Sequence, residues 1–192
     1  MDLRGWDERY RLRQQPEDLD AAPARLVIET AKPLPPGKAL DLACGTGRNA
    51  LWLADHGWNV TAVDGAPAAI QILQSRAVAA GVMVDAQVVD LEKGEYTIGR
   101  AAWDLIVMSY YLQRDLFEPA KHGVVPGGIV LAIVHITEPG EERTYKRLRP
   151  GELREYFDGW EILHFFEGKP ADPAHQRAVA EIVARRPVRI KL

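Results

Sequence analysis

Residues 39–49 have the composition and spacing of a loop that binds a nucleotide-like cofactor. An apolar run carries Asp41 near its end, and Gly45 and Gly47 follow as a Gly-x-Gly turn before a predicted helix. Glycine has no Cβ, so such a turn bends tightly and lets a ligand approach the backbone. The free N–H groups at the start of the next helix are donors for that ligand. The glycines alone do not say which cofactor is bound.

Two cofactor classes compete for this loop. With Ala50 included, Gly45-x-Gly47-x-x-Ala50 also fits the dinucleotide fingerprint, which predicts an NAD(P)-dependent oxidoreductase. Asp41 separates the two classes, because a carboxylate beside a pyrophosphate repels it. S-adenosylmethionine instead carries a sulfonium and an ammonium group, which a carboxylate attracts. We therefore favour S-adenosylmethionine and keep the oxidoreductase as an alternative.

From Asp41 to Gly47 the sequence resembles the class I S-adenosylmethionine-dependent methyltransferases, whose signature is Asp-x-x-x-Gly-x-Gly. The resemblance implies that the loop wraps the methionine portion of the cofactor. Asp64 comes directly after the predicted strand 58–63. At this position one carboxylate can accept hydrogen bonds from both hydroxyls of a ribose. NAD enzymes share this feature, so it supports an adenosine-containing cofactor of either class. Asp90 and Leu91 come directly after the predicted strand 83–89. There the resemblance implies an acid for the adenine amino group and a backbone N–H beside it.

Each of these residues also has a structural interpretation. An aspartate at a strand end is often a turn former or a helix N-cap. The joint spacing of Asp41, Asp64 and Asp90 at three strand ends favours cofactor binding. Cys44, the one cysteine, sits inside the loop, where we expect it to pack rather than to act as a nucleophile.

The elements that carry these residues alternate between strands and helices. Predicted helices cover 48–56, 67–80, 115–122 and 152–157, and an N-terminal helical region covers 7–31 with an interruption near Pro16. Further strands are expected at 103–108 and, after a turn at 126–128, at 129–136. The last two strands, 160–166 and 177–185, have no helix between them and should be antiparallel neighbours. The predicted fold is α/β: a three-layer, Rossmann-like, seven-stranded, mostly parallel sheet with an antiparallel last strand and helices on both faces.

Length and composition predict a single domain over 1–192. The resemblance implies that it is a methyltransferase domain, with a helical cap at 1–32 and a cofactor-binding core at 37–192. One cysteine among 192 residues fits a cytoplasmic protein, and the mixed-charge N-terminus does not read as a signal peptide. A net charge of −3 gives no general attraction to nucleic acid. We expect no membrane span and no metal, and a monomer or homodimer.

A closer resemblance covers nearly the whole chain. It rests on Trp6-x-x-Arg9-Tyr10, on Gly47-Arg48-Asn49 and on residues 152–161, which look like the tellurite-resistance methyltransferases and their thiopurine-type relatives. The resemblance implies methylation of soft acceptors: tellurite, selenium species and thiols. It also implies that the N-terminal aromatic segment closes over the cofactor as a lid, with packing of a helix as the alternative.

The acceptor should meet residues beyond the fourth and fifth strands, because ligands of open α/β sheets bind at the carboxyl ends of strands. His135 is a candidate base or orienting group, with a structural role as the alternative. Residues 109–112 read Ser-Tyr-Tyr-Leu rather than the Asn/Asp-Pro-Pro-Tyr of many amino-methylating enzymes, which leaves a small-molecule acceptor. An oxyanion acceptor would need cationic donors, for which arginine is well suited. The candidates are Arg48, Arg114, Arg177 and His175, with Arg149 less favoured. The predicted catalytic residues are His135, Tyr110, Arg114 and Arg177.

The predicted cofactor is S-adenosyl-L-methionine, with S-adenosyl-L-homocysteine as product. Its predicted contacts are Asp41, Ala43, Gly45, Gly47, Arg48, Asn49, Asp64, Gly65, Asp90, Leu91, Ser109, Tyr10 and Trp6. A catalytically idle, cofactor-binding partner subunit is a further alternative. Tellurite specificity does not follow from the sequence, because residues 168–176 are short and proline-rich and do not align with the acceptor loop of the family.

Overall fold

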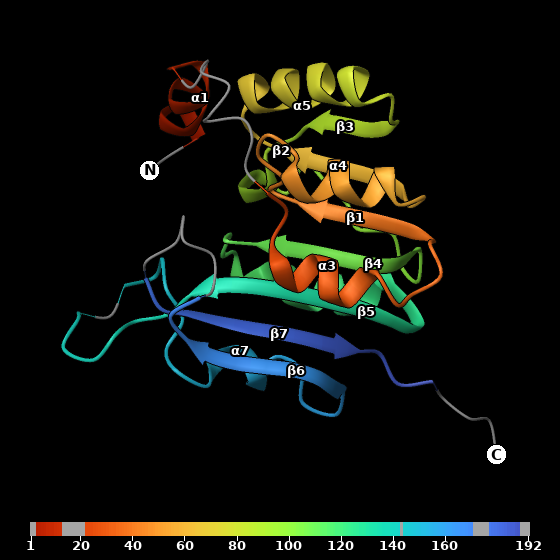
Figure 1. Ribbon diagram of the computed structural model, residues 1–192. Coiled ribbons are helices and arrows are strands. Elements are labelled where there is room, and N and C mark those ends of the chain that lie inside the picture. The colour runs from red at the N-terminus through yellow and green to blue at the C-terminus, as the bar shows by residue number, and fades with distance from the viewer. Residues whose placement is uncertain (1–2, 13–21, 143, 171–176, 189–192) are drawn as a thin grey trace. The chain divides into compact units, whose positions relative to one another are not determined.

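The computed structural model describes residues 3–12, 22–142, 144–170 and 177–188 (Figure 1). The chain divides into two compact units, Met1–Thr97 and Ile98–Leu192. The predicted division into a cap at 1–32 and a core at 37–192 stays a prediction.

The first unit contains three parallel strands, β1 (Lys38–Leu42), β2 (Asn59–Asp64) and β3 (Val84–Val88), in the order β3-β2-β1. Leu42 pairs with Val63 in β2, and Asp64 pairs with Val88, so the three carboxyl ends lie at one edge. The β1 residues from Ala39 to Leu42 are all buried, as expected for a parallel strand covered on both faces.

The helices of the first unit are α1 (Leu3–Leu12), α3 (Arg25–Ala31), α4 (Arg48–Asp55) and α5 (Pro67–Ala80). α4 packs against β1, β2 and β3, α5 packs against β2 and β3, and α1 lies beside α5 (Figure 1). α5 begins with a proline, which suits the first helical turn, and ends at Gly81 in the left-handed conformation that commonly terminates helices.

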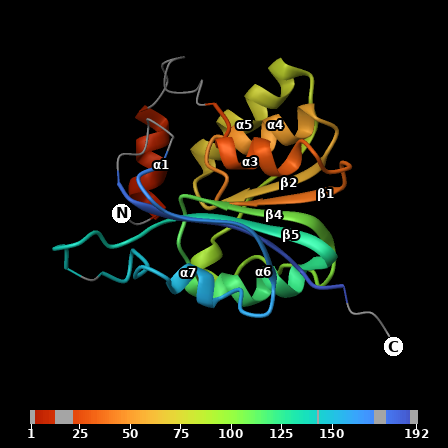
Figure 2. The ribbon, with the colours of Figure 1, turned by 60° about the horizontal axis from the view of Figure 1, so that its bottom comes forward.

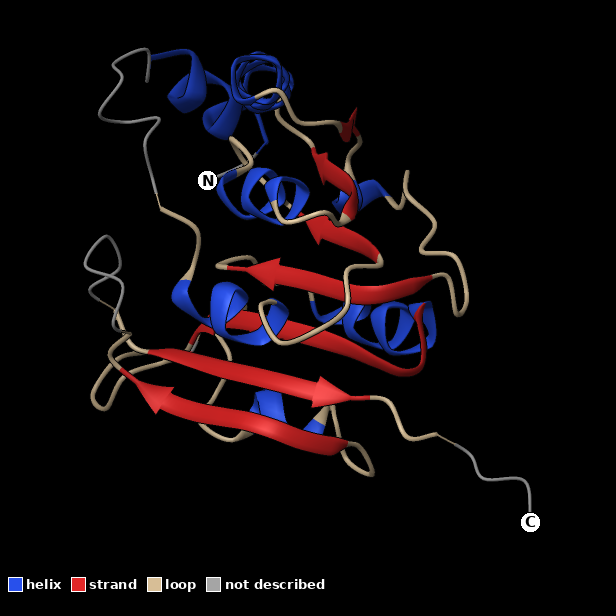
Figure 3. Cartoon of the chain, turned by 45° about the vertical axis from the view of Figure 1, so that its right-hand side comes forward, coloured by secondary structure: helices blue, strands red, loops and turns tan. Residues whose placement is uncertain are grey.

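The second unit contains β4 (Trp103–Ser109), β5 (Val124–His135), β6 (Glu161–Gly168) and β7 (Val179–Arg185), in the order β4-β5-β7-β6. β4 and β5 are parallel, whereas β7 is antiparallel to both β5 and β6 (Figure 3). The helices α6 (Phe117–Gly123) and α7 (Glu152–Glu155) lie on the same side of these strands (Figure 2). Phe117 of α6 stacks on Tyr156, which follows α7, with ring centroids 4.4 Å apart.

The strand order of the sheet is β3-β2-β1-β4-β5-β7-β6. This order confirms the prediction of a Rossmann-like α/β fold with a seven-stranded, mostly parallel sheet and an antiparallel last strand. It also confirms that the last two strands are antiparallel neighbours.

Several predicted boundaries were wrong. β5 begins at Val124 rather than Ile129, because the Pro126-Gly127-Gly128 turn lies within the strand as an irregularity that shifts its register with β4. α7 ends at Glu155, before the predicted end at 157. The N-terminal helical region begins at Leu3, before Asp7, and its predicted interruption near Pro16 lies outside the described residues.

Candidate active site

Asp64, the last residue of β2, holds the glycine loop in place. Its two carboxylate oxygens accept hydrogen bonds of 2.8 Å each, one from the N–H of Gly45 and one from the N–H of Ala66. Burial raises the pKa of the Asp64 carboxyl above its ordinary value, and these two N–H donors partly offset the shift. Each oxygen keeps a second lone pair, so the carboxylate can still accept from a ligand hydroxyl.

The loop between β1 and α4 adopts left-handed backbone at Ala43, Gly45 and Gly47, with φ of 54°, 55° and 81°. A Cβ on Gly47 would lie 2.1 Å from Leu73 Cδ1, so a side chain there would force Leu73 to shift and would also be strained at this φ. The loop is also tied to α5, because Arg76 Nη1 donates to the Thr46 carbonyl at 3.0 Å. These contacts fix the backbone that a cofactor would approach.

Asp41 lies beneath this loop with only 1 % of its surface exposed. Within the described residues, neither of its carboxylate oxygens accepts a hydrogen bond of normal geometry. Burial raises the pKa of the carboxyl to about 7, although the positive charge of Arg48 and the nearby Ala50 N–H act in the opposite direction. A buried carboxylate without a full partner is costly and is stabilised by any cation brought close to it.

Cys44 is buried beside the two acids. Burial, with the nearby charges of Asp41 and Asp64, raises the pKa of its thiol well above the ordinary value. A thiol held in its protonated form is a weak nucleophile. The structure therefore agrees with a packing role for Cys44.

Asp90 is the N-cap of a short 3-10 helix, Leu91–Lys93. Its Oδ1 accepts from the N–H groups of Glu92 and Lys93, and its Oδ2 pairs with Lys93 Nζ at 2.9 Å. The hydrogen bond from the Lys93 ammonium is the main cause that lowers the pKa of this carboxyl. Asp90 therefore acts as a helix N-cap, which is the structural role considered for it from the sequence. Its contact with adenine stays a prediction.

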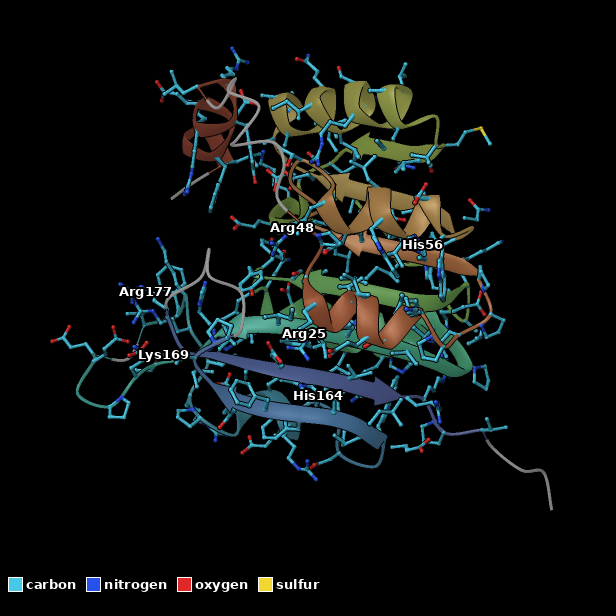
Figure 4. All side chains as sticks on the ribbon, viewed as in Figure 1. Arg25, Arg48, His56, His164, Lys169 and Arg177 are labelled. Atoms are coloured by element: carbon cyan, nitrogen blue, oxygen red, sulfur yellow. The ribbon has the colours of Figure 1, made fainter. Side chains whose placement is uncertain are left out.

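Arg48 and Asn49, at the start of α4, hold the chain segment that leads into α3. Asn49 is buried and its Oδ1 accepts from the Ala24 N–H at 2.9 Å, whereas Arg48 Nη1 donates to the Ala22 carbonyl at 3.3 Å (Figure 4). Both side chains therefore tie the start of α4 to the segment before α3, and their predicted contacts with the cofactor stay predictions.

The predicted lid residues lie on α1. The hydroxyl of Tyr10 is 2.9 Å from where a Cβ of Gly45 would stand, so Tyr10 lies directly against the glycine loop. Trp6 stacks on Tyr10 with ring centroids 6.1 Å apart, and the Arg9 guanidinium lies over the Trp6 ring. Trp6 itself is 39 % exposed. Tyr10 thus contacts the glycine loop directly, and the lid role of Trp6 and Tyr10 stays a prediction.

In the second unit, β4 ends in a strained turn. Ser109 Oγ is buried and, among the described residues, has no hydrogen-bond partner. Tyr110 follows with φ of 60°, and its N–H donates to the Ile133 carbonyl. A bulky residue with positive φ is uncommon and such strain clusters at functional sites. The Tyr110 ring lies 5.7 Å from the His135 ring, centroid to centroid.

His135, the last residue of β5, faces positive charge. Burial is the main cause that lowers the pKa of its imidazole, the guanidinium groups of Arg177 and Arg147 lower it further, and a backbone hydrogen bond with Ala178 acts in the opposite direction. The imidazole is therefore neutral at neutral pH and able to accept a proton. Arg147 was missed by sequence reasoning, because nothing in the sequence marks that it returns to the end of β5.

The two predicted arginines have different surroundings. Arg114 donates to Glu152 Oε1 at 2.8 Å and to the carbonyls of Tyr145 and Arg147, so its guanidinium holds the loop before α7. Arg177, labelled in Figure 4, lies just before β7. It shares the carboxylate of Glu141 with Arg147. The structure therefore brings Arg177, and not Arg114, to the charged cluster beside His135. His175 lies outside the described residues.

A family model described as "Tellurite resistance protein TehB" matches residues 19–171. The chain belongs to this family. Among curated relatives, a probable S-adenosyl-L-methionine-dependent methyltransferase TehB of Haemophilus influenzae is 28% identical over 151 residues, covering 73% of this chain and 52% of the relative. Hemagglutinin 1 of Eikenella corrodens is 30% identical over 155 residues, covering 73% of this chain and 49% of the relative. The chain spans about half the length of these relatives.

Solved structures agree with this assignment. The crystal structure of TehB from Haemophilus influenzae matches with a TM-score of 0.71 and 26% identity, covering 83% of this chain and 61% of that one. The fold also matches a Burkholderia thailandensis 1,6-didemethyltoxoflavin-N1-methyltransferase with bound S-adenosylhomocysteine, with a TM-score of 0.70, 18% identity and coverage of 96% and 87%. The family match and the fold therefore agree, because TehB of Haemophilus influenzae has the same fold as this chain.

Among the described residues of this TehB-family chain, no helix combines the length and apolar character needed to cross a membrane. No group of three or more His, Cys, Asp or Glu in the described ranges is arranged to hold a metal ion.

Proposed function

We propose that this chain transfers the methyl group of S-adenosylmethionine to sulfur, selenium or tellurium of a small-molecule acceptor. The observation that carries the proposal is Asp41, a buried carboxylate without a full partner beneath a glycine loop of the family signature. The bound cofactor supplies an already activated methyl group on a sulfonium. The residues therefore need to bind, orient and exclude water, and to move a proton only if the acceptor carries one.

In this proposal the first unit binds the cofactor. Asp41 favours its cationic groups, and Asp64 accepts from the ribose hydroxyls through lone pairs that Gly45 and Ala66 leave open. Asp90 and the Leu91 N–H bind adenine. The remaining proposed contacts are Ala43, Gly45, Gly47, Arg48, Asn49, Gly65, Ser109, Trp6 and Tyr10.

The second unit supplies the acceptor side. A neutral His135 can take the proton of a thiol or selenol, and Tyr110 beside it limits the access of water. Arg147 and Arg177 both pair with the carboxylate of Glu141. Their guanidinium groups are the donors that an anionic acceptor, or the anionic form of one, would need. Arg114 is proposed to shape the loop rather than to touch the acceptor.

The test has two stages. Calorimetric titration with S-adenosylmethionine, S-adenosylhomocysteine and NADH should give binding of the two sulfur compounds and none of NADH. Turnover is then followed as S-adenosylhomocysteine formation with tellurite, selenite and a panel of thiols, and Glu141→Gln should lower the KM of anionic acceptors. Binding without turnover on any acceptor would contradict the proposed reaction, and binding of NADH instead would contradict the assigned cofactor.

A cytoplasmic location, a monomeric or homodimeric state and the absence of nucleic-acid and membrane partners are part of the same proposal. The single cysteine supports the cytoplasmic location, and the net charge of −3 supports the absence of nucleic-acid partners. Size measurement in solution at several concentrations tests the oligomeric state.

A further inference from the structure

The N-terminus of α5 is capped by a residue from α1. Ala66, at the N-cap position, has no side-chain acceptor for the free N–H groups of the first turn. Asp7 Oδ1 instead accepts from the Ala68 N–H at 2.8 Å, across 61 positions of sequence. Aspartate is among the best capping residues, but it ordinarily comes from the chain just before the helix. This cap therefore joins two separate helices.

The Asp7 carboxylate is held in position by its own helix. Its Oδ2 accepts from Arg11 Nε at 2.8 Å, one turn further along α1. The Asp7 side chain is 17% exposed, whereas that of Arg11 is 69% exposed. One oxygen thus caps α5 while the other makes an ion pair at the surface.

α1 meets the proposed cofactor site at two more points, both at glycines. A Cβ on Gly65, which follows Asp64, would lie 2.4 Å from Leu3 Cδ1, and a Cβ on Gly45 would lie 2.9 Å from the Tyr10 hydroxyl. No residue of α1 is buried among those described. Beside these two contacts, the cap by Asp7 adds a directional hydrogen bond between α1 and α5.

We propose that Asp7 is a positioning residue that latches α1 over the cofactor by capping α5, so that the cofactor leaves only after this cap breaks. The proposal rests on the proposed function, since it takes the loops that α1 touches to be the cofactor site. Asp7 needs no contact with the cofactor: it acts through Leu3 and Tyr10, which it holds against Gly65 and Gly45.

The experiment measures the dissociation rate of S-adenosylhomocysteine by stopped-flow displacement for the full chain and three variants. Asp7→Ala removes the cap, and the loss of a typical N-cap should speed dissociation about fivefold. Asp7→Asn keeps an acceptor of equal capping quality, so it should stay within about twofold of the wild type. Glu8→Ala, which removes a neighbouring exposed carboxylate of α1, is the matched control and should leave the rate unchanged.

Amide hydrogen exchange at Ala68 separates a latch from general stabilisation. Exchange at this position should be slower with S-adenosylhomocysteine bound, and faster in Asp7→Ala than in Asp7→Asn. Equal dissociation rates for Asp7→Ala and the wild type would overturn the latch, as would an Asp7→Asn rate equal to that of Asp7→Ala, which would assign the effect to the Arg11 ion pair.

If Asp7→Ala does not fold, the wild type alone still decides the question. Protection of the Ala68 N–H that is unchanged by S-adenosylhomocysteine would overturn the latch. A wild-type protein that binds no S-adenosylhomocysteine would instead refute the proposed function.

Discussion

Replacing Asp41 by asparagine should stabilise the cofactor-free protein and weaken its affinity for S-adenosylmethionine. The carboxyl group has a pKa of about 7 in the folded chain, against an ordinary value of 3.8, because it is buried. The folded state therefore binds this proton more tightly than the unfolded state does. Its contribution to stability is present at low pH and is lost as the pH rises from about 4 to about 7.

The size of the effect follows from this shift. A change of about three pKa units corresponds to about 4 kcal/mol of destabilisation at pH 8, when Asp41 is ionised. Asparagine removes the charge, but its buried amide atoms also lack partners. This lack of partners costs about 1–3 kcal/mol and reduces the gain in stability by that amount. The expected net gain for Asp41→Asn is thus about 1–3 kcal/mol. In a chain of this size each kcal/mol raises Tm by roughly 2–4 °C.

The same shift makes cofactor affinity depend on pH. S-adenosylmethionine should bind the ionised form of Asp41, whose population falls about tenfold from pH 8 to pH 6 when the pKa is about 7. The wild-type affinity should fall by about the same factor. Asp41→Asn should bind more weakly than the wild type at pH 8 and lose this pH dependence.

Thermal unfolding at pH 5 and pH 8, with calorimetric titration at pH 6, 7 and 8, measures both effects. At pH 5 the wild-type carboxyl is neutral, so wild type and Asp41→Asn should differ much less in Tm than at pH 8. Asp158→Asn, which neutralises an exposed carboxylate, is the control and should change neither quantity. An unchanged Tm of Asp41→Asn at pH 8, or a wild-type affinity that is constant from pH 6 to pH 8, would refute the reasoning.

Three further substitutions test the candidate site. Asp64→Ala should weaken S-adenosylmethionine binding at least about tenfold, because two ribose hydrogen bonds of about 1–1.5 kcal/mol each are lost and Gly45 is released; titration measures this. Gly47→Ala should lower stability by about 1–3 kcal/mol, because its Cβ would overlap Leu73; an unchanged melting temperature would contradict the contact. His135→Gln should lower turnover of thiol acceptors and leave cofactor affinity intact. Since the pKa of His135 is lowered, wild-type turnover should persist below the ordinary histidine range and fall as the imidazole becomes protonated, and a pH–rate profile without this limb would remove His135 from the mechanism.

The parts of the site that could be predicted are those encoded by neighbours in sequence. Asp41 and Asp64 lie near the carboxyl ends of strands that are recognisable from their apolar and β-branched residues. A parallel sheet brings such strand ends to one edge. The Gly-x-Gly turn is equally local, because a tight bend requires its residues whatever surrounds it. Strand ends and turns therefore carried the cofactor prediction.

The parts that could not be predicted depend on side chains that meet across long stretches of chain. Asp7 caps a helix 61 positions away, and Arg76 reaches back to Thr46 from a helix face that has no distinguishing pattern. Arg147 comes to His135 through a loop whose course no periodicity describes. The start of β5 at Val124 was missed for a different reason, since a Pro-Gly-Gly turn ordinarily lies outside a strand and here lies within one.

The position of β7 between β5 and β6 has a consequence for synthesis of the chain. β5 is buried almost throughout in the folded protein, and its second neighbour is Val179–Arg185, the last strand along the sequence. During synthesis, β5 and β6 therefore cannot be linked within the sheet until β7, which pairs with both, has been made. Until then β5 presents an apolar edge with free backbone groups, which is the kind of surface that pairs with other chains. We therefore expect aggregation of an interrupted chain to begin at this strand.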